Sequence, residues 1–173
     1  MSAPAAIRIR VATADDVRTL ADIGYAAWER DLLPFLRNSP ALRAGERQRL
    51  HAAVSESIGR IIVAEARGVT AGWCSRSARR PYIPYLFVTP AMQNHGVGTC
   101  LLRRMESLLE LEGHDRVQLE TLADNVRAVH FYEHQGYRIL AMKPGGHAVR
   151  DSHMSVRLEK RLSPFEGEIS DIG

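Results

Sequence analysis

Two glycines, Gly96 and Gly98, stand between an apolar stretch that ends at Val88 and a segment with apolar residues at helical spacing. The first backbone N–H groups of a helix have no partner within the helix, and the helix dipole favours negative charge there. Glycines lack a Cβ atom, so an anion can approach this backbone closely. The pattern predicts a phosphate-binding turn at the start of a helix that Gly113 ends.

The residues around Gly98 separate three kinds of phosphate-binding turn. A P-loop needs a lysine directly after its last glycine, but Thr99 follows here, so that alternative fails. A dinucleotide-binding turn needs a third small residue where Leu101 stands, and it normally follows the first strand of a domain. What remains is the pattern Gln93-x-x-Gly96-x-Gly98.

A second pattern lies further along the chain, where a strand, a helix and another strand are expected in turn. Two motifs then carry a resemblance: Val88-x-Pro90-x-x-Gln93-x-x-Gly96-x-Gly98 and Leu119-Glu120-Thr121-Leu122-Ala123-Asp124-Asn125-x-x-Ala128-x-x-Phe131-Tyr132-x-x-x-Gly136-Tyr137. They resemble the acetyl-CoA-binding motif, and the elements that follow it, of the GCN5-related N-acetyltransferases, the GNAT family. The resemblance extends over most of residues 7–160, although 31–58 is not diagnostic.

The resemblance implies an enzyme that moves the acetyl group of acetyl-CoA to an amine by direct attack in a ternary complex. Phe87 and Val88 would pair with the pantetheine arm as an added strand would, and the glycine turn would bind the pyrophosphate. A backbone N–H of residues 82–88 would stabilise the oxyanion. The implied cofactor-binding residues are Phe87, Val88, Gln93, Asn94, Gly96, Val97, Gly98, Thr99, Asn125 and Tyr132.

Two further residues carry the expected proton transfers. Tyr132 is the implied acid for the departing thiolate, because a phenol with a pKa near 10 can deliver a proton. Many relatives carry a carboxylate base on the strand before the turn, but residues 82–88 contain none. Glu120 is our candidate base, acting directly or through water with a pKa raised by burial; the alternative is a hydrogen-bonded structural glutamate. His147 is a weaker candidate.

Pro84 interrupts the strand expected over 82–88. Proline cannot donate a hydrogen bond to a neighbouring strand, so it indicates either an edge position or a break. In the GNAT family a distortion here splays the central strands and opens the cofactor cleft.

Two other functions compete with catalytic acetyl transfer. His130-Phe131-Tyr132-Glu133-His134 matches the H-x-x-E-H motif of zinc hydrolases, but a third ligand would be needed and these positions already belong to the acetyltransferase pattern. Zinc hydrolysis through His130, Glu133 and His134 is therefore a remote alternative, and we expect no metal. The missing strand carboxylate keeps open a non-catalytic acetyl-CoA sensor or structural subunit.

Hydrophobic periodicity predicts the strands and helices that position these residues. Strands are expected at 7–11, 60–66, 71–77, 82–88, 117–122, 137–142 and 153–159, with a hairpin turn at 67–70 and a loop at 143–147. Helices are expected through Val17, Leu20, Ile23 and Ala27, at 41–58, after Gly98 and at 125–135. This order predicts an α/β fold, a mixed and mostly antiparallel twisted sheet of about seven strands with flanking helices.

The composition limits the number of domains, the cellular location and the kinds of partner that we expect. With 173 residues, 45% of them hydrophobic, the chain suits one domain over 1–162, followed by an acidic tail at 163–173 that is disordered or docks on a partner. No apolar stretch of about 18 residues and no secretory signal is present, so we expect a soluble, cytoplasmic protein without membrane contact. The net charge of +3 and the scattered arginines do not indicate nucleic-acid binding.

The acceptor is expected to be a small-molecule amine rather than a protein. By resemblance it would contact residues 28–36, Tyr82, Tyr85 and 145–150, although Trp28 and Phe35 are better explained as core residues. Cys74 and Cys100 form no C-x-x-C pair and are expected to be reduced and packed. The resemblance also allows a homodimer.

Overall fold

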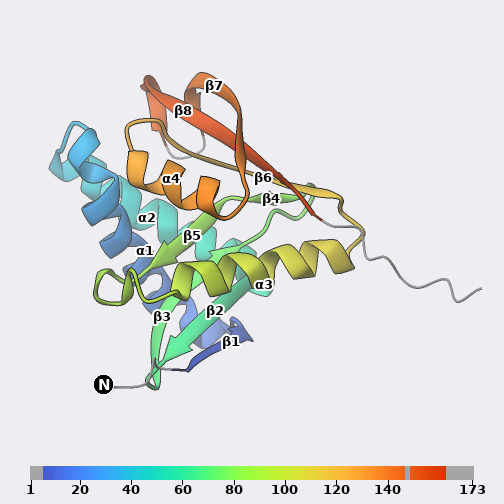
Figure 1. The fold of residues 1–173 in the computed structure, drawn as a ribbon. Helices are drawn as coiled ribbons and strands as arrows, with labels where there is room; N and C mark the ends of the chain where they lie inside the picture. The colour runs from blue at the N-terminus through green and yellow to red at the C-terminus, as the bar shows by residue number, and fades with distance from the viewer. Residues whose placement is uncertain (1–5, 147–148, 163–173) are drawn as a thin grey trace, which may run out of the picture.

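Two four-stranded sheets form the frame of the protein (Figure 1). The computed structural model describes residues 6–146 and 149–162, so His147 and the acidic tail lie outside the described residues. The first sheet has the order β1-β2-β3-β5, with β1 at Ile7–Val11, β2 at Ile61–Ala66, β3 at Val69–Ser75 and β5 at Tyr85–Val88. The second has the order β4-β6-β8-β7, with β4 at Tyr82–Ile83, β6 at Arg116–Leu122, β7 at Arg138–Gly146 and β8 at Val149–Arg161.

Helices cover both faces of the first sheet. They are α1 at Val17–Asp31, α2 at Pro40–Ser57, α3 at Val97–Leu111 and α4 at Val126–His134. In Figure 1, α3 crosses one face of this sheet while α1 and α2 lie behind the other, and α4 lies against the second sheet. Among the described residues, no helix combines the length and the apolar character that crossing a bilayer requires.

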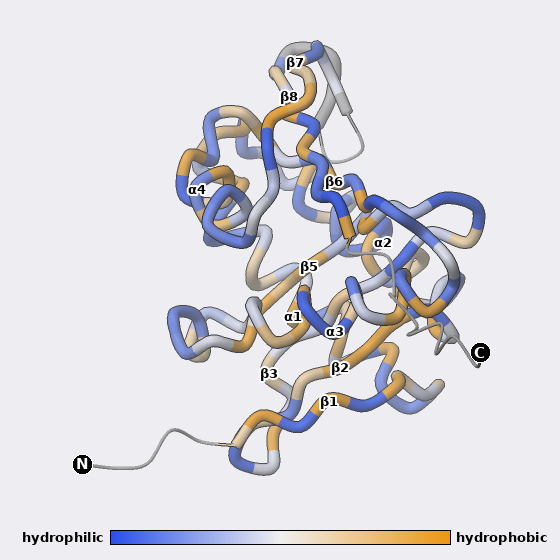
Figure 2. Tube along the Cα trace, turned by 45° about the vertical axis from the view of Figure 1, so that its right-hand side comes forward, coloured by the Kyte–Doolittle hydropathy of each residue, from blue (hydrophilic) through white to orange (hydrophobic). Residues whose placement is uncertain are grey.

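The apolar residues divide into two clusters, one on each face of the first sheet. Strand residues alternate between faces, so Cys74 packs with the α3 cluster whereas Trp73 packs with α1 and α2. The Trp73 indole N–H also donates to the carbonyl of Leu20, at 2.8 Å. Figure 2 shows that β2 and β5 are coloured mainly as hydrophobic, as strands covered on both faces should be.

The strand predicted at 82–88 is divided between the two sheets at Pro84. Before the proline, β4 pairs in parallel with β6, with Tyr82 opposite Gln118. After it, β5 pairs antiparallel with β3, with Phe87 opposite Trp73. The predicted splaying of the central strands is therefore confirmed, and the eight described strands correspond to the seven expected, with one of them broken.

Two predicted boundaries in the hairpins need correction. The turn between β2 and β3 contains only Arg67 and Gly68, which have φ values of 55° and 76°, so β3 begins at Val69. Lys143, predicted in a loop, belongs to β7 because it pairs with Ser155 of β8. Pairing with a distant strand overrides the local preference of a Pro-Gly-Gly sequence for a loop.

Burial on α3 departs from the simple amphipathic pattern at two positions. Glu106 is a charged residue, yet it is buried, where it accepts hydrogen bonds from the Tyr137 hydroxyl and the Lys160 ammonium, both at 2.9 Å. Cys100, expected to be packed, is exposed on the outer side of the helix, whereas the prediction for Cys74 is confirmed.

Two aromatic residues near the end of α1 behave differently. Trp28 is buried, with 2% exposure, and its predicted place in the core is confirmed. The prediction for Phe35 is wrong, because its side chain is 41% exposed in the short turn at Leu33–Phe35.

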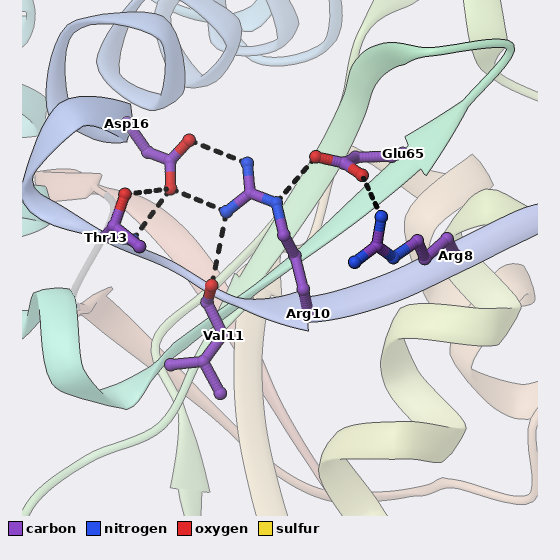
Figure 3. A network of polar contacts seen from close by, with 6 residues as sticks. All are labelled: Arg8, Arg10, Val11, Thr13, Asp16 and Glu65. Carbon is purple, nitrogen blue, oxygen red and sulfur yellow. Dashed lines mark hydrogen bonds and ion pairs between the residues drawn. The ribbon is translucent and has the colours of Figure 1, made fainter.

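An ion-pair network fastens the N-terminal strand to the rest of the first sheet (Figure 3). The Arg10 guanidinium on β1 donates to both carboxylate oxygens of Asp16, at 2.7 and 2.8 Å, and to Glu65 of β2, at 2.6 Å. The hydrogen bond from Arg10 lowers the pKa of Asp16 to about 2. Asp16 also accepts from the backbone N–H of Thr13, at 2.7 Å, so one carboxylate orders the connection between β1 and α1.

Candidate active site

A cavity of about 360 Å³ opens where β5 and β6 diverge. Among the strands of the described residues, none pairs with the edge of β5 that faces away from β3, and β6 is paired on this side only with the short β4. Residues 84–88 line one wall and residues 120–122 the other. The break at Pro84 therefore creates the cavity, and α4 and the end of α1 close it.

The predicted phosphate-binding turn lies at one end of this cavity. Gly96 precedes α3 in a left-handed conformation, with φ of 81°, and no side chain in the described part of the chain caps the helix. The backbone N–H groups of residues 94–99 donate to no group within the described residues, and Cys100 is the first to pair, with the Gly96 carbonyl at 3.0 Å. The turn offers a row of unpaired donors, which is suited to an anion.

Most residues predicted to bind the cofactor line the cavity: Phe87, Val88, Gln93, Asn94, Gly98, Asn125 and Tyr132. Gly96, Val97 and Thr99 do not. The Val97 side chain is in the core, and the Thr99 hydroxyl accepts from the Gln135 amide at 3.3 Å. Gly96 and Val97 can therefore act on an anion only through their backbone, whereas the Thr99 hydroxyl keeps its own proton to donate.

Side chains hold the glycine turn between α1 and α4. The Gln93 amide donates to the Asp31 carboxylate at 2.9 Å and to the Val88 carbonyl at 3.3 Å. The Arg127 guanidinium donates to the Asn94 side-chain carbonyl at 3.1 Å. The turn is thus braced before any ligand arrives, which reduces the entropy lost on binding.

Asn125 lies at the N-terminus of α4 and lines the cavity. Its side-chain oxygen accepts from the backbone N–H of Ala128, at 3.3 Å, so it caps the helix. The amide nitrogen of the same side chain is left for other contacts.

Tyr132 lies on α4 and packs edge-on against Phe131 and Tyr137, with ring centroids 5.2 and 5.7 Å away. Its side chain also lines the cavity. Burial, followed by the nearby Cys74 and Tyr82, raises the pKa of the phenol above its usual value. A protonated hydroxyl is therefore available in the cavity at neutral pH.

Glu120 lines the cavity with a side chain that is only 7% exposed. One carboxylate oxygen accepts two hydrogen bonds from Arg157, at 2.9 and 2.8 Å, and one from Lys143, at 2.8 Å. Burial alone would raise the pKa of Glu120, but the hydrogen bonds and charges of Lys143 and Arg157 outweigh it and lower the pKa. The predicted raised pKa is therefore wrong.

Several cavity residues come from the first two helices, which carry no motif specific to a function. Asp31 and Leu32 fall within the expected acceptor region, whereas Arg49 on α2 was not predicted. The Arg49 guanidinium donates to the Tyr85 hydroxyl at 2.6 Å and to Glu46 at 2.8 Å. Tyr85 lines the cavity as expected.

The remaining polar lining comes from α4. Arg127, His130 and His134 line the cavity, whereas Glu133 of the H-x-x-E-H motif does not. Across residues 6–146 and 149–162, no group of three or more His, Cys, Asp or Glu side chains is arranged to hold a metal ion. The zinc-hydrolase alternative gains no third ligand from this arrangement.

The chain belongs to the GNAT family of acetyltransferases, because the profile of the Acetyltransferase (GNAT) family matches residues 24–137. The chain is also 32% identical, over 82 residues, to the uncharacterized protein YdhI of Bacillus subtilis (strain 168). That match covers 47% of this chain and 46% of the relative, so the similarity spans about half of each protein.

Solved structures share the fold at low sequence identity. A GCN5-related N-acetyltransferase from Rhodopseudomonas palustris has a TM-score of 0.71 and 20% identity, covering 94% of this chain and 98% of that one. YjaB from Escherichia coli has a TM-score of 0.73, 19% identity and coverages of 91% and 98%. The PaiA N-acetyltransferase from Thermoplasma acidophilum, solved in complex with coenzyme A, has a TM-score of 0.71, 18% identity and coverages of 90% and 99%.

Proposed function

We propose that the protein transfers the acetyl group of acetyl-CoA to a small-molecule amine by direct attack in a ternary complex. The observation that carries the proposal is the meeting, in one cavity, of the unpaired N–H groups of the glycine turn, the open edge of β5 and the phenol of Tyr132. Membership of the GNAT family supports acetyl transfer as the class of reaction. The acceptor and the roles of individual residues belong to the proposal.

The cavity suits coenzyme A in two ways. The glycine turn would bind the pyrophosphate through its backbone N–H groups, and the open edge of β5, at Phe87 and Val88, would pair with the amide groups of the pantetheine arm. When bound, acetyl-CoA supplies an activated thioester carbonyl. A β5 backbone N–H directed at that carbonyl would stabilise the oxyanion formed on attack.

Tyr132 would donate the proton that the departing thiolate needs. Its pKa lies above the usual value, so the phenol stays protonated during binding. It can give up its proton once the negatively charged thiolate of coenzyme A develops beside it. Phe131 and Tyr137 hold the ring in place through their edge-on contacts.

Glu120 fits the role of an ionised carboxylate that orients the acceptor as an ammonium ion. Its pKa is lowered, so it remains ionised at neutral pH and is a weak base. Both Lys143 and Arg157 contact the same oxygen, Oε1. We propose that water carries the proton away from the amine while Glu120 orients it.

The acceptor would enter at the end of the cavity formed by α1 and α2. Asp31, Arg49 and Tyr85 line that end together with the apolar Ala27 and Leu32. A volume of about 360 Å³ is typical of a small-molecule site, which favours a small amine over a protein side chain.

A screen of amines separates this function from a non-catalytic one. The protein is incubated with acetyl-CoA and a panel of amines, and release of free thiol is followed. Amine-dependent thiol release supports the enzyme. Binding of coenzyme A without thiol release from any amine would instead support the sensor or structural subunit, and no binding at all would refute both.

A further inference from the structure

Three residues on one face of α4 form what we call the basic row: Arg127, His130 and His134. Their spacing of three and four residues places them on one side of the helix, and all three line the cavity. The carboxylates that line the cavity, Asp31 and Glu120, come from α1 and β6 and not from α4. The cavity therefore has a basic wall of its own on this helix.

The basic row lies beside the glycine turn, because side-chain hydrogen bonds tie α4 to that turn at both ends. Near the start of α4, Arg127 donates to Asn94, at 3.1 Å. Just after its end, the Gln135 amide donates to Thr99 in the first turn of α3, at 3.3 Å. Arg127 thus contacts the glycine turn directly, and His130 and His134 lie on α4 between these two contacts.

The contacts of His134 fix which of its nitrogens can meet an anion. Its Nδ1 lies 2.8 Å from the carbonyl oxygen of His130, and a carbonyl can only accept, so Nδ1 carries the hydrogen. In the neutral ring, Nε2 then presents a lone pair, which repels a phosphate oxygen. Only the imidazolium form donates from Nε2, so phosphate binding at His134 requires that the ring take up a proton.

The other groups that line the cavity set the charge around His134. Those that titrate or carry charge are Asp31 of α1, Arg49 of α2, Tyr85 of β5, Glu120 of β6, and Arg127, His130 and Tyr132 of α4. Among the lining residues, the carboxylates belong to elements other than α4, and Glu133, the carboxylate of α4, does not line the cavity.

We infer that the basic row binds phosphate groups of the coenzyme from the side opposite the backbone of the glycine turn, with proton uptake at His134. This inference rests on the proposed use of acetyl-CoA. It also gives a role to the two histidines of the H-x-x-E-H motif, as anion ligands in place of metal ligands.

Binding measured by calorimetry tests the inference without reference to turnover. We expect the double variant His130→Gln/His134→Gln to bind coenzyme A about tenfold more weakly than wild type at pH 6, since hydrogen bonds to charged groups are worth about that much. S-acetyl-pantetheine, which has no phosphate, should bind both proteins equally. Arg103→Gln, an exposed change on α3 outside the cavity lining, is the control and should match wild type.

Two further measurements identify which phosphate group the basic row binds and whether His134 takes up a proton. Dephospho-coenzyme A lacks the 3′-phosphate, so a tenfold loss that persists with it assigns the basic row to the pyrophosphate, and a loss that disappears assigns it to the 3′-phosphate. Titration in two buffers of different ionisation enthalpy should show proton uptake on coenzyme A binding by wild type and less uptake by His134→Gln.

Unchanged affinity of the double variant for coenzyme A would overturn the inference while leaving the proposed function intact. An equal loss for S-acetyl-pantetheine would also overturn it, because the change would then act on the shape of the cavity. A wild-type protein that bound no coenzyme A would refute the inference and the proposed function together.

Discussion

Glu120 on β6 and Arg157 on β8 are direct cross-strand partners, and the guanidinium donates two hydrogen bonds to a single oxygen of the carboxylate. Lys143 of β7 adds a third hydrogen bond to the same oxygen. The three strands thus hold an ionised carboxylate at the cavity between two cationic side chains. This arrangement explains why the pKa of Glu120 is lowered although the side chain is nearly buried.

Replacing Glu120 with Gln should raise KM for the amine more than it lowers kcat. The carboxylate that orients the ammonium ion is lost, whereas the proposed proton path through water remains. Because the pKa of Glu120 lies below its usual value, this residue should give no titration step in the activity of wild type between about pH 5 and pH 8. Steady-state kinetics across that range check both statements. A fall in kcat with KM unchanged would contradict the proposed role.

Replacing Tyr132 with Phe should lower kcat by about a hundredfold, the usual scale of general acid catalysis, while the affinity for coenzyme A changes less than about twofold. Tyr25→Phe is the matched control, because Tyr25 is buried in α1 but does not line the cavity. Kinetics and calorimetry on both variants make the comparison. Equal turnover by Tyr132→Phe and wild type would remove Tyr132 from the mechanism.

Gly96 and Gly113 allow backbone strain to be separated from anion binding. Both have left-handed φ values, 81° and 89°, and a Cβ atom added to either would meet nothing within 4 Å. Alanine at either position should therefore cost about 1 kcal/mol of stability through strain. Only Gly96→Ala should also weaken coenzyme A binding, since Gly96 precedes the unpaired N–H groups of α3. Urea denaturation and calorimetry measure the two effects, and equal affinities for the two variants would count against the anion-binding turn.

Asp16 should contribute to stability in a way that depends on pH. Its pKa is lowered from the usual value of an aspartate to about 2, so the ionised form is favoured by folding. The contribution is complete above the unfolded pKa and is lost as pH falls through the folded pKa, in the window from about pH 4 to pH 2. Asp16→Asn should cost about 1 kcal/mol at pH 7, because the ion pair is partly exposed to solvent.

Denaturation of Asp16→Asn at pH 7 and at pH 2 tests this dependence. The difference from wild type should be present at pH 7 and should shrink by pH 2. Asp15→Asn, at the exposed neighbouring position, serves as the control and should match wild type at both. A deficit of the same size at pH 2 and pH 7 would mean that the ion pair is not its cause.

The glycine turn and the helix that carries Tyr132 could be predicted from sequence because their signals are local. Gly96 and Gly98 lie within a few residues of the helix that they begin, and the spacing from Asn125 to Tyr132 fits a single helix. The break at Pro84 was also within reach, because proline acts on its own strand. These features need no knowledge of distant partners.

The environment of Glu120 could not be predicted in the same way. Its partners, Lys143 and Arg157, lie on two other strands, and their contact depends on the register of β6, β8 and β7. Arg49 was missed for a similar reason, since α2 has a weak apolar pattern and reaches the cavity only through tertiary packing. Burial and charge at a site depend on such long-range pairing, which local patterns do not specify.

The division at Pro84 has a consequence for the energetics of the whole fold. In the part of the chain that the structure describes, no strand-to-strand hydrogen bonds join β5 to the second sheet, so the chain itself is the link along this strand. A substrate arm lying along the edge of β5 would act as a missing strand and tie the two halves together. Substrate would then also be a structural ligand, adding about 2.7 kcal/mol to the unfolding free energy at a concentration one hundred times its Kd.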